Sequence, residues 1–362
     1  MGVTLENTRK YLMESPTAGG TSAGNVATLN RVILPVIRRV MPTVIANELV
    51  GVQPLTGPVG QIHTLRVRYS DTASAAGVVA GEEALSPFKI AEAYSGNTST
   101  GKAASTASLE GQAGNRMSIQ ILKQTVEAKT RKLSARWTFE AAQDAQAQQG
   151  IDVEAEIMAA LAQEITAEID QEILASLSSL AGTATQTYDQ ANVSGTATFV
   201  GDEHAALAIQ INRVSNLIAQ RTRRGAGNWA VVSPFALTIL QSATTSAFAR
   251  TTEGTFEAPT NTKFVGTLNN ALKVYVNSYA TDSTPVLIGY KGGSESDAAA
   301  FYCPYIPLMS SGVVLDPSTF EPTVSFMTRY GYVELSNTAS SLGNAADYLG
   351  KVAITDGNVK FS

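Results

Sequence analysis

The sequence contains very few of the residues on which metal, redox and nucleophilic chemistry depend. In 362 residues there is one cysteine, Cys303, and there are two histidines, His63 and His204. A single cysteine cannot form an internal disulfide, and its setting FYCPY is typical of a packed apolar segment. Neither histidine has a second histidine or a cysteine at metal-ligand spacing, or a nucleophile motif nearby, so we expect both at the surface or at a cap.

The sequence also lacks a long apolar run and an excess of basic residues. No stretch of about 18 or more apolar residues occurs and the N-terminus has no charged-then-apolar leader, which predicts a soluble cytoplasmic product without a membrane partner. Lys and Arg number 26 against 31 Asp and Glu, so no basic face is expected to hold nucleic acid by counterion release. With 44% hydrophobic residues the chain can bury a sizeable core in one to three domains.

One segment has the spacing of a phosphate-binding loop but lacks two of its parts. Residues 96–102 read GNTSTGK, yet Ala103 stands where a hydroxyl would bind magnesium, and no apolar strand precedes Gly96. We therefore interpret the segment as a flexible loop tip. The sequence predicts no cofactor, no metal and no enzymatic activity.

Charge is divided unevenly along the middle of the chain. No Lys or Arg occurs between Trp137 and Asn212, where there are twelve acids, whereas basic residues crowd the preceding stretch. These bases are Arg116, Lys123, Lys129, Arg131, Lys132 and Arg136. Such segregation can steer one copy of a chain onto another, and solvated faces without a role are the alternative. Three acids at four-residue spacing could also hold a divalent cation, although such a face more often is solvated or meets a basic neighbour; they are Glu164, Glu168 and Glu172.

The first third of the chain predicts an arm, short helices and a long hairpin. Residues 1–27 are rich in Gly, Thr, Ser and Asn and predict a mobile arm, and residues 28–50 follow three-four spacing that Pro35 and Pro42 must split into two helical pieces. Alternation begins at Ile62 and returns over residues 117–137, which predicts two strands of one hairpin. Between them, residues 71–116 contain 27 Gly, Ala, Ser or Thr out of 46, and we expect this segment to leave its own subunit and lie on a neighbour.

The rest of the chain predicts one very long helix followed by an α/β region. The helix is expected over 151–180 and would be about 45 Å long. Its apolar residues recur every four positions, so the apolar stripe rotates gradually around the helix and is expected to pack against different partners along its length. A second helix is expected over 202–224, and Ser233-Pro234 has the pattern of a cap and first-turn proline. The strands expected in this region are 229–232, 272–276 and 286–290.

Three stretches resemble the major head proteins of T-even-like myoviruses. The first is LPVIRRVMPTVIANELVGVQPLTGPVGQIHTLRVRY, residues 34–69, with its paired arginines and its GVQP..GP.G turn. The second is KTRKLSARWTFEAAQD followed by the acidic long helix. The third is IGYKGGSESDAAAFYCPYIPLMSSGVVLDPSTFEPTVSFMTRYGYVEL, residues 288–335, with GYKG, PY.PL, DP.TF.P and TRYG in order. Together they span most of the chain.

The resemblance implies an α+β chain with the Hong Kong 97 phage coat-protein fold. The implied parts are an N-terminal arm (1–62), an extended β-hairpin loop (63–136), a peripheral domain with a long spine helix (137–182), an axial α/β domain (183–312) and a return to the peripheral domain (313–362). The implied function is a major capsid protein that builds hexamers and pentamers of an icosahedral head around double-stranded DNA, without sequence-specific DNA binding. An encapsulin-like nanocompartment shell of the same fold, with enzyme cargo, is the alternative; a hydrolase or nucleotide binder is a third, less favoured reading.

The resemblance also implies a place of assembly, further partners and two sets of site residues. The chain would assemble in the host bacterial cytoplasm and remain in the virion, with portal, scaffold, maturation protease and decoration proteins as partners. We expect bases of the hairpin root to face acids of a neighbouring spine helix; they are Lys129, Arg131, Lys132 and Arg136 on one side and Glu156, Glu164 and Glu168 on the other. Leu12-Met13-Glu14 before Ser15 resembles the family's processing signal, with cleavage after Glu14, and a chance tripeptide is the alternative.

Overall fold

The structure is a computed structural model that describes most of the chain from residue 45 onward. The described ranges are 45–73, 77–82, 84, 94–97, 102–193, 200–243, 248–250, 264–269, 271–295, 297–335 and 345–360. The expected arm, the processing residues Leu12, Glu14 and Ser15, and most of the expected helical pieces lie outside these ranges. Of those pieces the described part is α3 (Ala46–Leu49).

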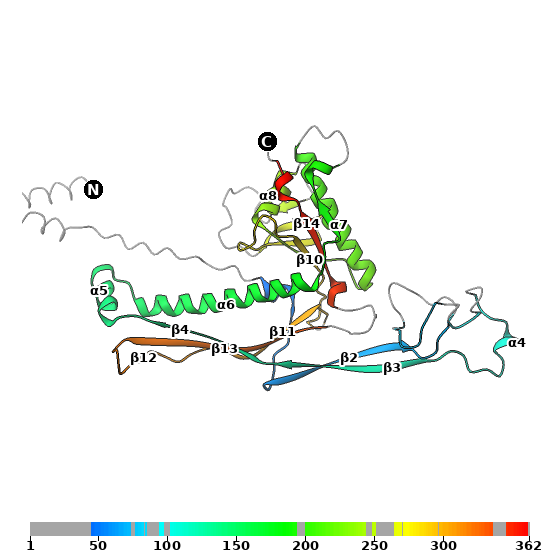
Figure 1. Cartoon of the computed structure of the whole chain (residues 1–362), viewed down its shortest axis with the longest axis horizontal. Coiled ribbons are helices and arrows are strands. Elements are labelled where there is room, and N and C mark those ends of the chain that lie inside the picture. The colour runs from blue at the N-terminus through cyan, green and yellow to red at the C-terminus, as the bar shows by residue number, and fades with distance from the viewer. Residues whose placement is uncertain are drawn as a thin grey trace, which may run out of the picture.

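A long helix, α6 (Val153–Leu180), forms a strut along one side of the molecule (Figure 1). It begins at Asp152, whose carboxylate accepts hydrogen bonds from the backbone N–H groups of Glu154 and Ala155 and so satisfies two otherwise unpaired donors. Its 28 residues span about 42 Å. The predicted long helix is therefore confirmed, and a shorter helix, α5 (Phe139–Gln149), packs at its far end.

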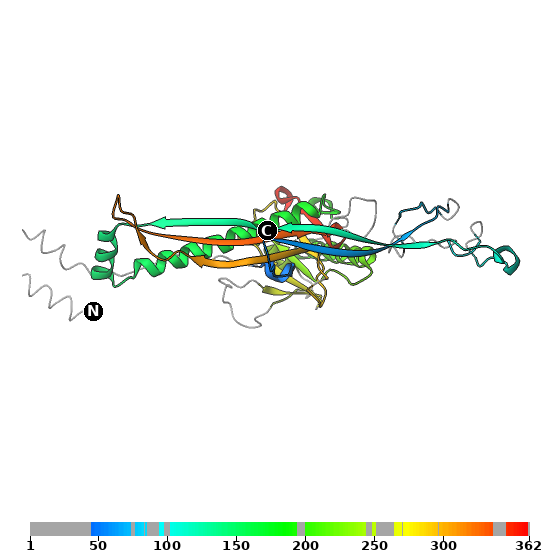
Figure 2. The same cartoon turned by 90° about the horizontal axis from the view of Figure 1, so that it is seen from below.

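A five-stranded sheet runs along the strut. It contains β1 (Gly51–Val52), β11 (Ala300–Ser310), β13 (Pro322–Glu334), β12 (Val314–Leu315) and β4 (Lys129–Arg136). Strand β4 pairs antiparallel with β13 over eight residue pairs, from Lys129 opposite Tyr330 to Arg136 opposite Thr323. Seen from below, β4, β13 and β11 lie side by side beneath α6 (Figure 2).

A seven-stranded sheet with two helices forms the body beside the other end of the strut. Its strands in spatial order are β5 (Gln186–Tyr188), β14 (Leu349–Ile354), β10 (Val286–Gly289), β6 (Trp229–Val232), β9 (Leu272–Val276), β8 (Phe264–Leu268) and β7 (Phe248–Arg250). The apolar faces of α7 (Val200–Thr222) and α8 (Pro234–Ser242) pack against this sheet. Short 3-10 turns occur at Gln190–Asn192, Ala345–Tyr348 and Asp356–Asn358. Among the described residues, no helix is both long enough and apolar enough to cross a membrane.

A two-stranded hairpin extends away from both sheets. Strands β2 (Val59–Tyr69) and β3 (Met117–Glu127) pair antiparallel over eleven residues, which confirms the predicted hairpin (Figure 1). The second predicted strand, 117–137, is longer than β3, because its remainder forms β4, which pairs with β13 instead of β2. At its outer end lie α4 (Thr106–Leu109) and a small apolar cluster in which the rings of Tyr69 and Tyr94 lie 4.5 Å apart. Within the expected phosphate-like loop, Asn97 and Lys102 form an isolated antiparallel bridge.

The apolar stripe of α6 serves two cores in succession. Its first half packs with Leu161 and Ile165 against Val324 and Phe326 of β13. Its second half packs against the seven-stranded sheet in a cluster that also includes α3. That cluster contains Ile173, Leu174, Leu177, Trp229, Val231, Tyr275, Leu287 and Leu349. The stripe drifts because four residues turn slightly more than one full helical turn, so one straight helix holds both sheets.

Two details differ from the sequence-based expectations. The division expected between 312 and 313 does not follow sheet membership, because β11 already pairs with β13 while β14, near the C-terminus, pairs within the seven-stranded sheet. His204 is not at the surface: it is fully buried, its Nδ1 lies 2.5 Å from the Ser242 hydroxyl and its Nε2 lies 3.1 Å from the backbone carbonyl of Lys360. Burial lowers the pKa of His204, so we expect a neutral ring that links α7, α8 and the C-terminal segment.

Candidate functional site

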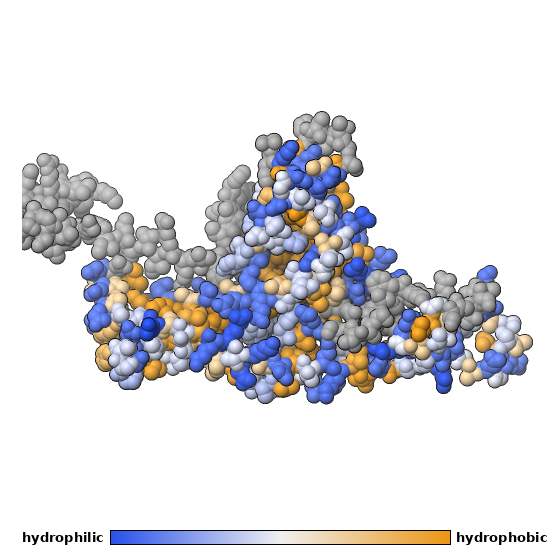
Figure 3. Space-filling model, in the orientation of Figure 1, coloured by the Kyte–Doolittle hydropathy of each residue, from blue (hydrophilic) through white to orange (hydrophobic). Residues whose placement is uncertain are grey.

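One face of the hairpin carries large apolar side chains that no described part of the chain covers. Leu65 lies opposite Ile121 and Val67 opposite Ile119, and directly opposed residues of an antiparallel pair share a face. Leu65, Ile119 and Ile121 are 65%, 67% and 65% exposed. We call these three residues with Met117 the hairpin face. Figure 3 shows apolar surface over this part of the hairpin.

A second exposed apolar surface lies at the opposite end of the molecule, where β11, β12 and β13 end. Its members, here called the distal patch, are Leu308, Met309, Val313, Val314, Leu315 and Phe320. Phe320 is 68% exposed and sits in the left-handed region with φ of 58°. Exposed apolar side chains gathered at one end of a molecule mark a candidate site of protein association.

A polar cluster ties the sheet to the strut between these two ends. Arg131 of β4 donates from Nη1 to Glu168 at 2.7 Å and from Nη2 to Glu172 at 2.6 Å, and its Nε donates to the hydroxyl of Tyr330 at 2.7 Å. The same hydroxyl donates to Glu172. All three donor directions of the guanidinium are used, so β4, β13 and α6 are joined by one side chain.

The pKa values in this cluster shift as expected for a mutually satisfied group. Burial raises the pKa of Glu172, but the hydrogen bonds from Tyr330 and Arg131 outweigh burial and hold it below its ordinary value. Burial, together with the bond to Glu172, raises the pKa of Tyr330 to about 12. At neutral pH the cluster therefore contains an ionised pair bridged by a neutral phenol.

The predicted contact residues thus divide into two groups. The structure brings Arg131 and Glu168 together within one chain, whereas the prediction placed them on different copies. Arg136 lies 3.6 Å from Glu321, also of its own chain. Lys129, Lys132 and Glu164 are exposed and Glu156 is half-buried; a contact of these residues with another copy stays a prediction. In the described part of the chain, no three His, Cys, Asp or Glu residues are grouped to hold a metal.

Asp170 is a functional residue that the sequence reasoning missed. It is 1% exposed on α6, and its Oδ1 accepts the backbone N–H groups of Ile45 at 2.8 Å and Ala46 at 2.6 Å. The carboxylate therefore anchors the segment that begins at α3 to the strut. The available signal was an acid within the apolar stripe, between Ile169 and Ile173.

Exposed apolar side chains at both ends of the molecule, on the hairpin face and in the distal patch, are typical of a subunit that associates with other copies. The comparisons with known proteins identify its family. The model of the family "Major capsid protein Gp23" matches residues 26–354. The chain belongs to this family.

Relatives and solved structures agree with this assignment. The major capsid protein of Vibrio phage KVP40 is 29% identical over 421 aligned residues, covering 91% of this chain and 81% of the relative. That of Salmonella phage ViI is 31% identical, covering 89% and 80%. The fold is similar to that of the capsid of Myoviridae phage XM1, with TM-score 0.53 and 10% identity over 93% of this chain and 99% of the other.. It is also similar to the capsid structure of cyanophage P-SCSP1u, with TM-score 0.54 and 11% identity over 95% and 98%.

This member of the Gp23 family is a major capsid protein of a tailed double-stranded DNA phage with a Hong Kong 97-like fold. It is a structural component of the virion capsid and not an enzyme, and it assembles with copies of itself. The implied fold class and function are therefore confirmed, and the family match is to phage head proteins rather than to a nanocompartment shell.

Replacing Arg131 should loosen the sheet from the strut. We expect Arg131→Met to lower the free energy of unfolding of the unassembled chain by about 1–3 kcal/mol, because Glu172 and Tyr330 lose a charged partner. Since the folded-state pKa of Glu172 lies below its ordinary value of 4.5, this contribution is complete above about pH 4.5 and is lost as pH falls through the lowered pKa. Thermal melts from pH 7 down to pH 3 measure both effects.

Lys132→Met is the matched control, because Lys132 is the next residue and points to the other face of β4. Equal melting temperatures for the two variants at pH 7 would contradict the role assigned to Arg131.

Proposed function

We propose that copies of the chain form the hexamers and pentamers of the icosahedral head through a contact between the hairpin face of one copy and the first half of α6 of the next. The observation that carries the proposal is the exposed row Leu65, Ile119 and Ile121 on a hairpin that stands away from its own body. Each such side chain contributes about 1.5–3 kcal/mol when it is buried. Covering the row therefore contributes several kcal/mol toward a contact between copies.

The two apolar surfaces are placed to serve two different contacts. The hairpin face and the distal patch lie at opposite ends of an elongated molecule (Figure 1). A contact between two different surfaces repeats around a ring until it closes. We infer that the hairpin face serves contacts within a ring and that the distal patch serves contacts between rings.

The parts of the subunit then receive the following roles. The β2–β3 hairpin is the extended loop, the five-stranded sheet with α5 and α6 is the peripheral domain, and the seven-stranded sheet with α7 and α8 is the axial domain. The proposed arm is residues 1–62, and Asp170 holds its described part at the backbone N–H groups of Ile45 and Ala46. Sheet membership supports these divisions, except that it favours a peripheral place for β11 and an axial place for β14.

Charged residues set the register of the contact and add little to its strength. Exposed pairs contribute about 0–1 kcal/mol each, far less than the apolar row. Lys129, Lys132 and Arg136 would face acids such as Glu156 and Glu164 of a neighbouring strut. Arg131 and Glu168 would act indirectly, by fixing β4 on its own strut.

The head encloses double-stranded DNA without sequence-specific contacts, in line with the net charge of −5. Portal, scaffold, maturation protease and decoration proteins are the further partners that we propose on the basis of the family. Assembly takes place in the cytoplasm of the bacterial host.

Polar substitution of the hairpin face should stop assembly and leave the fold intact. The double variant Ile119→Ser/Ile121→Ser loses two side chains that we expect to be buried only between copies, so closed particles should fall by at least about 10-fold. Particles are counted by negative-stain microscopy, and circular dichroism of the unassembled chain checks the fold. Ile209→Ser is the matched control, because Ile209 on α7 is 68% exposed and lies outside both surfaces. Normal particles from the double variant would overturn the proposed contact.

Charge reversal at Lys132 distinguishes a role in the contact between copies from a role in folding. Lys132→Glu should reduce the yield of closed particles while the melting temperature of the unassembled chain stays unchanged, because this side chain is exposed and faces away from α6. Arg213→Glu, at an exposed position of α7, is the control. A normal particle yield from Lys132→Glu would contradict the proposed contact between Lys132 and an acid of a neighbouring copy.

Processing after Glu14 has a direct readout. If the family's signal operates at Leu12-Met13-Glu14, the chain in purified heads should begin at Ser15 and its intact mass should be lower by that of the first 14 residues. A chain that begins at Met1 or Gly2 in mature heads would rule out this cleavage.

A further inference from the structure

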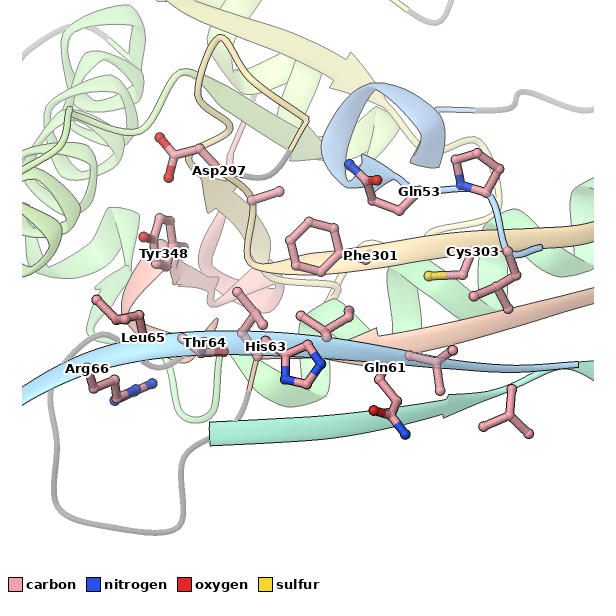
Figure 4. Close-up of a pocket in the computed structure, with 18 of the residues that line it drawn as sticks. Gln53, Gln61, His63, Thr64, Leu65, Arg66, Asp297, Phe301, Cys303 and Tyr348 are labelled. Atoms are coloured by element: carbon pink, nitrogen blue, oxygen red, sulfur yellow. The ribbon is translucent and has the colours of Figure 1, made fainter. Parts of the chain in front are cut away.

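A cavity of about 760 Å³ lies where the hairpin joins the body. Figure 4 shows it between β2 on one side and the start of β11 with the preceding loop on the other. Its floor is apolar and belongs to one small core cluster. The floor residues are Leu55, Ile62, Val126, Phe301, Cys303 and Leu335. The volume is in the range of about 300–1,000 Å³ that is usual for small-molecule sites.

The rim of the cavity is polar and carries more positive than negative charge. Arg221 and Arg224 reach it from the end of α7, Arg66 from β2, and Asp297 is the one acid among the described lining residues. Asp297 is already engaged, because its Oδ1 accepts from Arg224 Nη1 at 2.8 Å. Arg221 is half-buried and has no ion pair within the described ranges. The rim therefore offers a cation to a ligand that the floor would hold by apolar contact.

We propose that this cavity binds an amphipathic carboxylate, with the anionic head at Arg221 and the aliphatic tail on the floor beside Phe301 and Cys303. A purely apolar ligand would leave Arg221 without a counter-charge, and a small inorganic anion would leave the half-buried floor residues Leu55, Ile62 and Leu335 uncovered. An aliphatic acid would place its carboxylate at the charged rim and its tail on the apolar floor.

Binding at this place would couple to the position of the hairpin. The walls come from β2, which belongs to the hairpin, and from β11 and α7, which belong to the body. A ligand that contacts both walls holds the hairpin root in one orientation. The cavity shares Leu65 with the hairpin face, but neither Ile119 nor Ile121 lines it, so the two proposals can fail separately.

Cys303 supplies the readout, because it is the one thiol of the chain, lines the cavity and is 1% exposed. The probe is decanoate, titrated calorimetrically below its micelle concentration into the unassembled full-length chain. We expect saturable binding of one decanoate per chain. At tenfold excess over the dissociation constant, modification of Cys303 by a disulfide reagent should slow about 10-fold. Decyltrimethylammonium, with the same tail and the opposite charge, should neither bind at this stoichiometry nor protect the thiol.

Two variants of neighbouring arginines complete the test. Arg221→Gln should weaken decanoate binding by about 10-fold or more, because a charge-assisted contact is lost. Arg223→Gln, which removes the same charge from the same helix end but does not line the cavity, should leave binding unchanged. Absence of saturable decanoate binding, equal binding of the cationic probe, or equal losses in both variants would each overturn the proposal.

Discussion

The interaction on which the whole subunit depends is the packing of one helix, α6, against two different sheets. Its first half covers β4 and β13 through Leu161 and Ile165, and its second half reaches the seven-stranded sheet through Ile173 and Leu177. This shared element fixes the two sheets relative to each other, together with the direct packing of β11 against the seven-stranded sheet. Because the apolar residues of α6 are spaced by four, the apolar face rotates along the helix and packs first against one sheet and then against the other.

The same joint explains why the hairpin stands away from the body. Strand β3 passes into β4 with only Ala128 between them, and β4 is fixed to β13 by eight residue pairs and to α6 by Arg131. At the crossing point Gly331 admits Val126 closely: a Cβ on Gly331 would lie 2.4 Å from Val126 Cγ1. The hairpin root is therefore clamped, and the hairpin face cannot turn onto its own subunit without breaking that clamp. An apolar surface held out in this way marks a site of association with a second molecule.

Most of the confirmed predictions concern secondary structure and rest on local sequence patterns. Strands β6 and β9 occur over the expected residues, and α6 begins and ends within two residues of expectation, because periodicity and capping act over short distances. Sheet membership of β11 and β14 could not be predicted, since it depends on which distant strand lies alongside. The pairing of Arg131 with Glu168 was anticipated as a pair of charges, but the sequence cannot tell whether two charges 37 positions apart meet in one chain or between copies. Asp170 and the cavity depend on three-dimensional proximity in the same way.

If the hairpin face is covered only by a neighbouring copy, a cryo-electron microscopy reconstruction of the assembled shell will show it. We expect Leu65, Ile119 and Ile121 to contact the adjacent subunit, and the packing of α6 on both sheets to be the same as in the isolated chain. A reconstruction in which these side chains face solvent, or fold back onto their own subunit, would contradict it.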